Sequence, residues 1–206
     1  MARSFGSALV LCIVLCLVLA PVALADVPGP QGAVAPAEAA GPASTTGPTG
    51  GGCPGTHAKT YSGWEFRTLR ANTAVEYASS GAIYRTAGDD FIDLPVDLPQ
   101  GAQIIAINFY YLDNLPTEME FWLSRYTPWT GGYSNLTHVH SSGASASVRT
   151  AVLAAATACA PLATVDSTVN RYALEVKFGA AHLDARLFGA AVIYTVPTMY
   201  LPLVLR

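Results

Sequence analysis

The clearest indication of the fold class of this chain is the stretch Arg171-Tyr172-Ala173-Leu174-Glu175-Val176-Lys177-Phe178. Every second residue from Tyr172 to Phe178 is apolar, and charged or small residues lie between them. A period of two places one set of side chains in a core and the other in water, which is typical of a half-buried β-strand. The segment Ala185–Val196 repeats this signal with more apolar residues. We expect the two segments to pair as a hairpin against which the rest of the fold assembles.

Toward the N-terminus, further segments have strand patterns bounded by Gly, Pro, Asn and Asp. They are Ala82–Thr86, Phe91–Leu98, Gln103–Leu112, Met119–Tyr126 and Tyr133–Ser142. Pro95 lacks a backbone donor, so the strand that contains it is predicted to lie at a sheet edge or to be bulged. The strand that begins at Gln103 is apolar on both faces, which predicts a central position.

Two other segments are less regular. Val148–Ala158 combines Ala, which favours helix, with β-branched residues that favour strand. The flanking strands and the short turn before it favour a strand. Cys53–Ser80 is predicted to pack on the edge of the domain through Trp64, Phe66 and Leu69.

The spacing of these segments predicts an all-β fold. Seven to eight strands, separated by turn residues, favour a single antiparallel β-sandwich of jelly-roll or immunoglobulin-like type. We expect this domain to occupy residues 53–196, which is long enough to bury an adequate core.

Several short motifs follow one another in a particular order between Ala82 and Tyr194. They are Leu98-Pro99-Gln100-Gly101-Ala102, Tyr111-Leu112-Asp113, Leu123-Ser124-Arg125, Val165-Asp166-Ser167, Tyr172-Ala173-Leu174 and Leu187-Phe188-Gly189-Ala190-Ala191-Val192-Ile193-Tyr194. This order resembles a widespread group of uncharacterised bacterial exported β-sandwich domains. The resemblance implies the sandwich fold and carries over no catalytic residue.

Residues 1–25 have the pattern of a secretory signal peptide. Arg3 precedes the apolar run Ala8–Ala20, and Ala23-Leu24-Ala25 predicts cleavage after Ala25. The alternative is an N-terminal membrane anchor, but the run is shorter than the roughly 20 residues that a spanning helix needs. We therefore expect a secreted or cell-surface protein with no stable membrane span after cleavage.

The segments on either side of the domain differ from it in composition. Residues 26–52 are rich in Pro, Gly, Ala, Ser and Thr without hydrophobic periodicity, which predicts a disordered linker. Residues 197–206 contain the apolar sequence Tyr200-Leu201-Pro202-Leu203-Val204, which is similar to tails of exported proteins of some filamentous bacteria. Three interpretations stay open. The tail packs on its own domain, or a partner captures it as an added strand, which includes a homo-oligomer, or it is a sorting tag.

The charge of the chain limits the classes of partner that we expect, and its cysteines indicate a disulfide. Charged residues make up 12% of the 206-residue chain, and 11 Lys and Arg against 14 Asp and Glu give a net charge of −3. Lys and Arg do not cluster, so we expect no nucleic-acid partner. In an exported protein the two cysteines outside the signal peptide, Cys53 and Cys159, are predicted to form a disulfide. Two separate thiols are the alternative.

Tyr126, Trp129 and Tyr133 surround a Gly-Gly loop and are candidate ligand-binding residues. Aromatic rings with polar neighbours can stack on sugars or contact a partner protein. The alternative is that these rings fold back over the end of the sandwich.

His138-Val139-His140 places two imidazoles on one face of a strand, which makes His138 and His140 a candidate zinc or copper pair. A third ligand, such as His182 or an Asp, would come from elsewhere, and two exposed histidines are the alternative. An acidic stretch offers oxygen ligands for Ca²⁺ but lacks the pattern of a recognised calcium loop. It comprises Asp89, Asp90, Asp93 and Asp97. We expect no cofactor.

Patterns that indicate catalysis are weak. Ser141 and Ser142 lie near His140, but the chain has no Gly-x-Ser-x-Gly elbow. Four carboxylates are candidates for a glycosidase pair, although no spacing selects two of them. They are Asp113, Glu118, Glu120 and Glu175.

These observations favour an exported, non-catalytic β-sandwich that acts as a surface or matrix interaction module. Its expected partner is a glycan or a surface protein. A carbohydrate-binding module is the first alternative, and a secreted hydrolase is the second.

Overall fold

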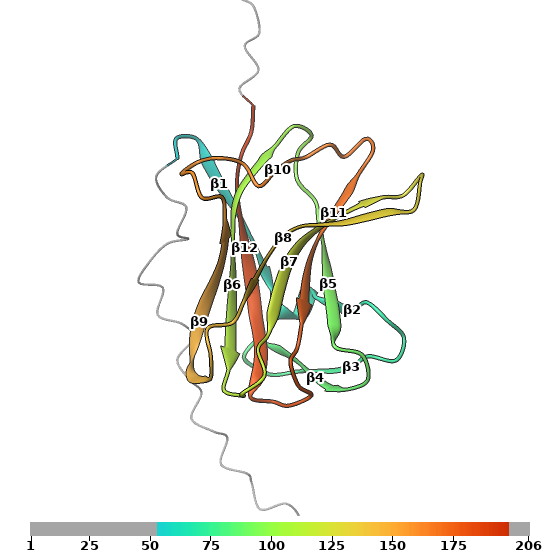
Figure 1. Ribbon diagram of the computed structural model, residues 1–206, viewed down its shortest axis with the longest axis vertical. Helices are drawn as coiled ribbons and strands as arrows, with labels where there is room; N and C mark the ends of the chain where they lie inside the picture. The colour runs from blue at the N-terminus through green and yellow to red at the C-terminus, as the bar shows by residue number, and fades with distance from the viewer. Residues whose placement is uncertain (1–52, 198–206) are drawn as a thin grey trace, which may run out of the picture. The chain divides into compact units, whose positions relative to one another are not determined.

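The computed structural model describes residues 53–197, which form two antiparallel β-sheets packed face to face (Figure 1). The predicted all-β class and the antiparallel β-sandwich are confirmed. The predicted signal peptide (residues 1–25), the linker (26–52) and the apolar tail beyond residue 197 lie outside the described residues.

The described residues form twelve strands and one 3-10 turn, which is more than the seven to eight strands predicted. The N-terminal elements are β1 (Thr56–Ser62), η1 (Gly63–Glu65), β2 (Arg67–Thr68), β3 (Ala74–Tyr77), β4 (Ile83–Ala87) and β5 (Phe91–Val96). The remaining strands are β6 (Gln103–Asp113), β7 (Glu120–Thr127), β8 (Gly132–His140), β9 (Ser145–Ala154), β10 (Ala163–Thr164), β11 (Arg171–Lys177) and β12 (Ala185–Thr195). The strands missed by the prediction are short or lie in the segment before Ser80, where the alternation is weak.

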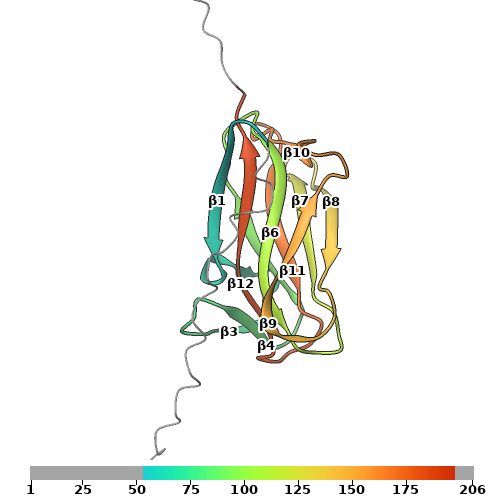
Figure 2. The same cartoon turned by 90° about the vertical axis from the view of Figure 1, so that its left-hand side faces the viewer.

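β12 and β6 form the middle of the seven-stranded sheet and pair with each other from Ala185↔Asp113 to Thr195↔Gln103. β1 and β4 pair with the other side of β12, whereas β9 and β10 pair with the other side of β6. Figure 2 shows β1 beside β12, and every residue of β1 pairs with a residue of β12. The central position predicted for β6 and the strand predicted within Val148–Ala158 are therefore confirmed.

The five-stranded sheet has the order β2-β5-β11-β7-β8, with β11 in the middle. The hairpin predicted between β11 and β12 is wrong, because β11 pairs with β5 and β7 while β12 belongs to the other sheet. Residues 178–184 carry the chain from one sheet to the other. A period of two reports that a strand has one buried face, but it does not report which strand lies beside it.

The edge or bulged position predicted for the strand that contains Pro95 is wrong, because β5 lies between β2 and β11 and is paired without a bulge. On one side of β5, Pro95 is the register partner of Ala173. On the other side, β2 pairs only with Ile92 and Asp93. The missing N–H of Pro95 therefore costs the sheet little.

Both sheets contribute to one hydrophobic core between them. β11 buries its alternate residues Tyr172, Leu174 and Val176, as the opening stretch predicts. Phe109 of β6 and Phe121 of β7 meet across the sandwich with ring centroids 4.9 Å apart. A second, smaller cluster of Ala106, Ala191 and Ile193 lies on the other face of the seven-stranded sheet. Within residues 53–197, no helix is long and apolar enough to cross a membrane.

A disulfide joins Cys53 to Cys159, which confirms the predicted pairing. It ties the residues before β1 to the loop between β9 and β10, across a sequence separation of 106.

Replacing both cysteines, Cys53→Ser with Cys159→Ser, should lower the free energy of unfolding by about 4 kcal/mol, because the unfolded chain regains the freedom of a long loop. Urea denaturation of the oxidised protein and the double variant measures this difference. Reduced wild-type protein is the matched control and should behave like the variant. Equal urea midpoints for all three samples would contradict the prediction.

Candidate functional site

The outer face of the five-stranded sheet carries rows of aromatic and polar side chains. Alternate residues of a strand share a face, and the register sets Glu175 of β11 between Asp93 of β5 and Trp122 of β7. The side chains on this outer face include Phe91, Asp93, Glu120, Trp122, Ser124, Tyr126, Tyr133, Asn135, His138, His140, Glu175 and Lys177.

Tyr126 and Tyr133 form a cross-strand pair at one end of this face, with ring centroids 5.1 Å apart. The hydroxyl of Tyr126 donates to Oε1 of Glu175, and the hydroxyl of Tyr133 lies 2.9 Å from Oε2 of the same carboxylate. Glu175 is only 1% exposed, although it lies on the outer face. The two tyrosines therefore cover this carboxylate and supply the hydrogen bonds that a buried charge needs.

The same geometry changes the acidity of several groups. Burial, followed by the hydrogen bond to Glu175, raises the pKa of Tyr126. Burial also raises the pKa of Tyr133. Both phenols therefore remain protonated donors at neutral pH. Burial and then the negative charge of Glu175 raise the pKa of Asp93, against the opposing effect of Arg67.

A cavity of about 520 Å³ opens beside Tyr126. Its lining residues are Leu69, Asp93, Pro95, Val96, Asp97, Tyr126, Arg171, Tyr172 and Ala173. Pro95 and Ala173 are register partners with small side chains, so the face is recessed at this row. Arg171 is held by hydrogen bonds from its guanidinium to the carbonyls of Ser167 and Asn170. The lining of the cavity thus combines apolar side chains, two tyrosines and three charged groups.

Of the three predicted ligand-binding aromatic residues, Tyr126, Trp129 and Tyr133, the structure brings only the two tyrosines into contact. Tyr126 and Tyr133 are in contact, whereas Trp129 lies in the loop between β7 and β8 and is 80% exposed. Among the described residues, no aromatic ring contact joins Trp129 to the tyrosines. The sequence did not indicate the roles of Glu175, Asp93 and Arg171, because these depend on which strands are neighbours. The alternation predicted that Glu175 faces water, and its burial under the tyrosines corrects that expectation.

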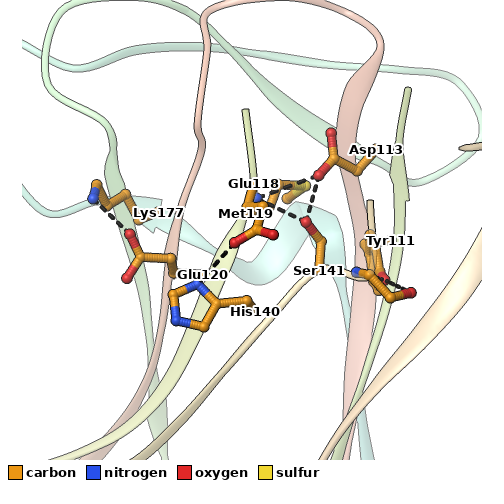
Figure 3. A network of polar contacts seen from close by, with 9 residues as sticks. Tyr111, Asp113, Glu118, Met119, Glu120, His140, Ser141 and Lys177 are labelled. Carbon is orange, nitrogen blue, oxygen red and sulfur yellow. Dashed lines mark hydrogen bonds and ion pairs between the residues drawn. The ribbon is translucent and has the colours of Figure 1, made fainter. Parts of the chain in front are cut away.

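His138 and His140 lie on one face of β8, with ring centroids 5.5 Å apart. His138 stacks on Trp122 at 6.4 Å, and Nδ1 of His140 lies 3.4 Å from Oε2 of Glu118 (Figure 3). His182, the residue suggested as a third ligand, has its Nδ1 3.5 Å from Oδ2 of Asp184. Across the described range 53–197, no group of three or more His, Cys, Asp or Glu is arranged to hold a metal ion.

All four carboxylates considered for a glycosidase pair already have partners. Asp113 accepts hydrogen bonds from the Ser141 hydroxyl at 2.5 Å and from the backbone N–H of Met119 at 3.3 Å (Figure 3). Glu118 faces His140, and Glu120 bonds to Nζ of Lys177 at 2.6 Å. Glu175 is covered by the two tyrosines, as described above. In the acidic stretch, Asp89 forms an ion pair with Arg70 at 2.5 Å.

Comparison with known proteins gives a likeness in structure only. No family model matches the chain, and no curated protein matches it in sequence. The isomalto-dextranase of Arthrobacter globiformis T6, complexed with panose, is 15% identical with a TM-score of 0.39, over 67% of this chain and 23% of that chain. The exo-β-1,3-galactanase of Phanerochaete chrysosporium, with galactose, is 12% identical with a TM-score of 0.39, over 66% of this chain and 29% of that chain.

A mutant of CBM29-2, a family 29 carbohydrate-binding module complexed with cellulohexaose, is 9% identical with a TM-score of 0.41. The match covers 70% of this chain and 94% of that chain. The chain spans less than a third of the length of the two enzymes.

Asp93→Asn should raise the melting temperature at pH 7. The pKa of Asp93 is raised above its ordinary value of 3.8, so the folded protein holds this proton more tightly than the unfolded chain does. Stability is therefore lost as the pH rises through the raised pKa, and the amide removes this loss. The gain should shrink as the pH falls and should vanish below the ordinary value, which thermal melts from pH 3 to pH 7 would measure.

A Glu175→Gln background is the control for the cause of this effect. The gain from Asp93→Asn should be smaller there, because the repelling charge is absent. An Asp93→Asn variant that melts at or below the wild-type temperature at pH 7 would contradict the assignment.

Proposed function

We propose that this β-sandwich is a non-catalytic, exported module that binds glycans at the outer face of its five-stranded sheet. The observation that carries the proposal is the cavity of about 520 Å³ beside Tyr126, whose ring is held in place by the buried Glu175. A volume of this size is within the range of small-molecule sites in proteins.

The cavity offers the two kinds of contact that a sugar ring needs. A pyranose has C–H faces that pack on aromatic and apolar groups, which the Tyr126 ring and the side chains of Pro95 and Ala173 supply. Its hydroxyls need acceptors and donors, which the carboxylates of Asp93 and Asp97 and the guanidinium of Arg171 supply in the lining. This mixture favours a neutral sugar over a purely apolar ligand.

The Tyr126 ring is organised before any ligand arrives. The hydroxyl of Tyr126 bonds to Glu175, and its ring packs on Tyr133. A side chain that is already ordered loses little conformational entropy on binding, so more of the contact energy appears as affinity. Trp129 does not line the cavity.

The proposed setting is outside the cell or at its surface. The Cys53–Cys159 disulfide supports this, because such bonds persist in oxidising compartments. The signal-peptide pattern of residues 1–25 supports the same setting. The proposed partner is a surface or matrix glycan.

Ala173→Leu should weaken glycan binding, because the added side chain fills part of the cavity that Ala173 lines. An array of neutral oligosaccharides from cellulose, xylan, mannan, galactan and α-glucan would first identify a ligand, and titration calorimetry would then measure its affinity. We expect at least a tenfold rise in Kd, which corresponds to about 1.4 kcal/mol. Tyr126→Ala should have a similar effect through loss of the aromatic ring.

Ala154→Leu is the matched control, because it adds the same side chain at an exposed position of β9 in the other sheet. It should bind like the wild type. The proposal fails if no oligosaccharide on the array binds the wild-type protein, or if Ala173→Leu binds as tightly as the wild type at an unchanged melting temperature.

A further inference from the structure

Trp64 of η1 and Tyr77 of β3 are two aromatic residues outside the cavity, and they are 54% and 51% exposed. The side chains of both residues form hydrogen bonds between η1 with the residue after it and the end of β3. Nε1 of Trp64 donates to the carbonyl of Ala78 at 3.0 Å, and the hydroxyl of Tyr77 donates to the carbonyl of Phe66 at 3.3 Å. The two side chains therefore reach between η1 and the end of β3 in opposite directions. We call them the Trp64–Tyr77 platform.

The turn that carries Trp64 is rigid. Oγ of Ser62 accepts from the backbone N–H of Trp64 at 3.1 Å, and Oε1 of Glu65 accepts from the backbone N–H of Ser62 at 2.8 Å. These reciprocal bonds form a capping box. Gly63 lies so close to β12 that a Cβ there would be 2.5 Å from the carbonyl oxygen of Leu187. The turn is thus fixed both by its own hydrogen bonds and by the strand beneath it.

The segment on the other side is equally well held. Tyr77 is the register partner of Ile83 in the β3–β4 pair. The backbone N–H of Ala78 donates to the carbonyl of Ala82 at 2.8 Å, and the carbonyl of Ala78 also accepts from Gly81 at 3.0 Å. Both rings are therefore anchored at their polar ends to ordered backbone. Binding to such pre-ordered rings costs little side-chain entropy.

The platform offers a ligand aromatic surface rather than hydrogen bonds. The indole N–H and the phenol hydroxyl are already bonded to backbone carbonyls. The neighbouring carboxylates of Glu65 and Glu76 also have partners, the backbone of Ser62 and the hydroxyl of Tyr84. A surface of this kind suits the flat C–H faces of sugar rings, because those faces present no polar group that needs a partner.

We propose that the Trp64–Tyr77 platform is a second binding site, which adsorbs the domain to the surface of an insoluble polysaccharide by stacking. A packed polysaccharide repeats the same weakly polar ring face over a wide area. Stacking on it therefore needs neither a cavity nor a chain end. The inference does not rest on the cavity, since it uses residues from η1 and β3 alone.

Depletion of the full-length purified protein by microcrystalline cellulose and by chitin tests this site. The wild type should be removed from solution by at least one of them. Trp64→Ala and Tyr77→Ala should each lower the bound fraction at least fivefold, whereas Trp64→Phe, which keeps a ring, should lower it less. Trp129→Ala, which removes an exposed indole from a loop tip, is the matched control and should bind like the wild type.

Footprinting of the wild-type protein tests the same site without a variant. Oxidative labelling read by mass spectrometry should show Trp64 and Tyr77 protected on the polysaccharide, and Trp129 labelled as in free protein. The proposal is overturned if neither polysaccharide retains the wild type. It is also overturned if the folded Trp64→Ala and Tyr77→Ala variants bind undiminished, or if Trp64 and Tyr77 are labelled equally with and without polysaccharide.

Discussion

β11 lies in the middle of the five-stranded sheet and supports side chains on both of its faces. Because it has a neighbour on each side, its inner residues pack against the opposite sheet while its outer residues meet side chains from β5 and β7. Leu174 is fully buried in the core, and Glu175, the next residue, is buried on the other face under two tyrosines. One strand therefore supports both the hydrophobic core and the candidate site.

In the candidate site, a buried carboxylate lowers the stability of the fold but holds two aromatic rings in place. Burying the Glu175 carboxylate costs free energy unless hydrogen bonds compensate for the lost water. The hydroxyls of Tyr126 and Tyr133 provide that compensation, and in doing so they fix the orientation of both rings. Asp93, which lies beside Glu175, lowers the stability of the folded protein when it is charged. Burial and the charge of Glu175 both disfavour its ionised form and raise its pKa. Natural proteins commonly accept such local costs at functional sites.

The two proposed binding surfaces use aromatic rings in different ways. At the cavity, the Tyr126 ring is part of a lining that also includes carboxylates and a guanidinium. At the Trp64–Tyr77 platform, the polar ends of the rings are bonded to backbone carbonyls, and the remaining surface is aromatic. The first arrangement can distinguish sugars through their hydroxyls, whereas the second favours extended surfaces. A domain with both would hold a soluble chain at one site and adsorb to a packed polymer at the other.

Local patterns in the amino-acid sequence were enough to predict the all-β class, the buried face of β11, the central position of β6 and the disulfide between Cys53 and Cys159. These features follow from local alternation and from the cysteine count, which a single chain displays directly. Long-range contacts in the folded protein place β11 and β12 in different sheets and bring Tyr126 and Tyr133 together over Glu175. The physical reason is that strand pairing depends on contacts between residues far apart in sequence. A period of two shows which face of a strand is buried, but it contains no information about the neighbouring strand.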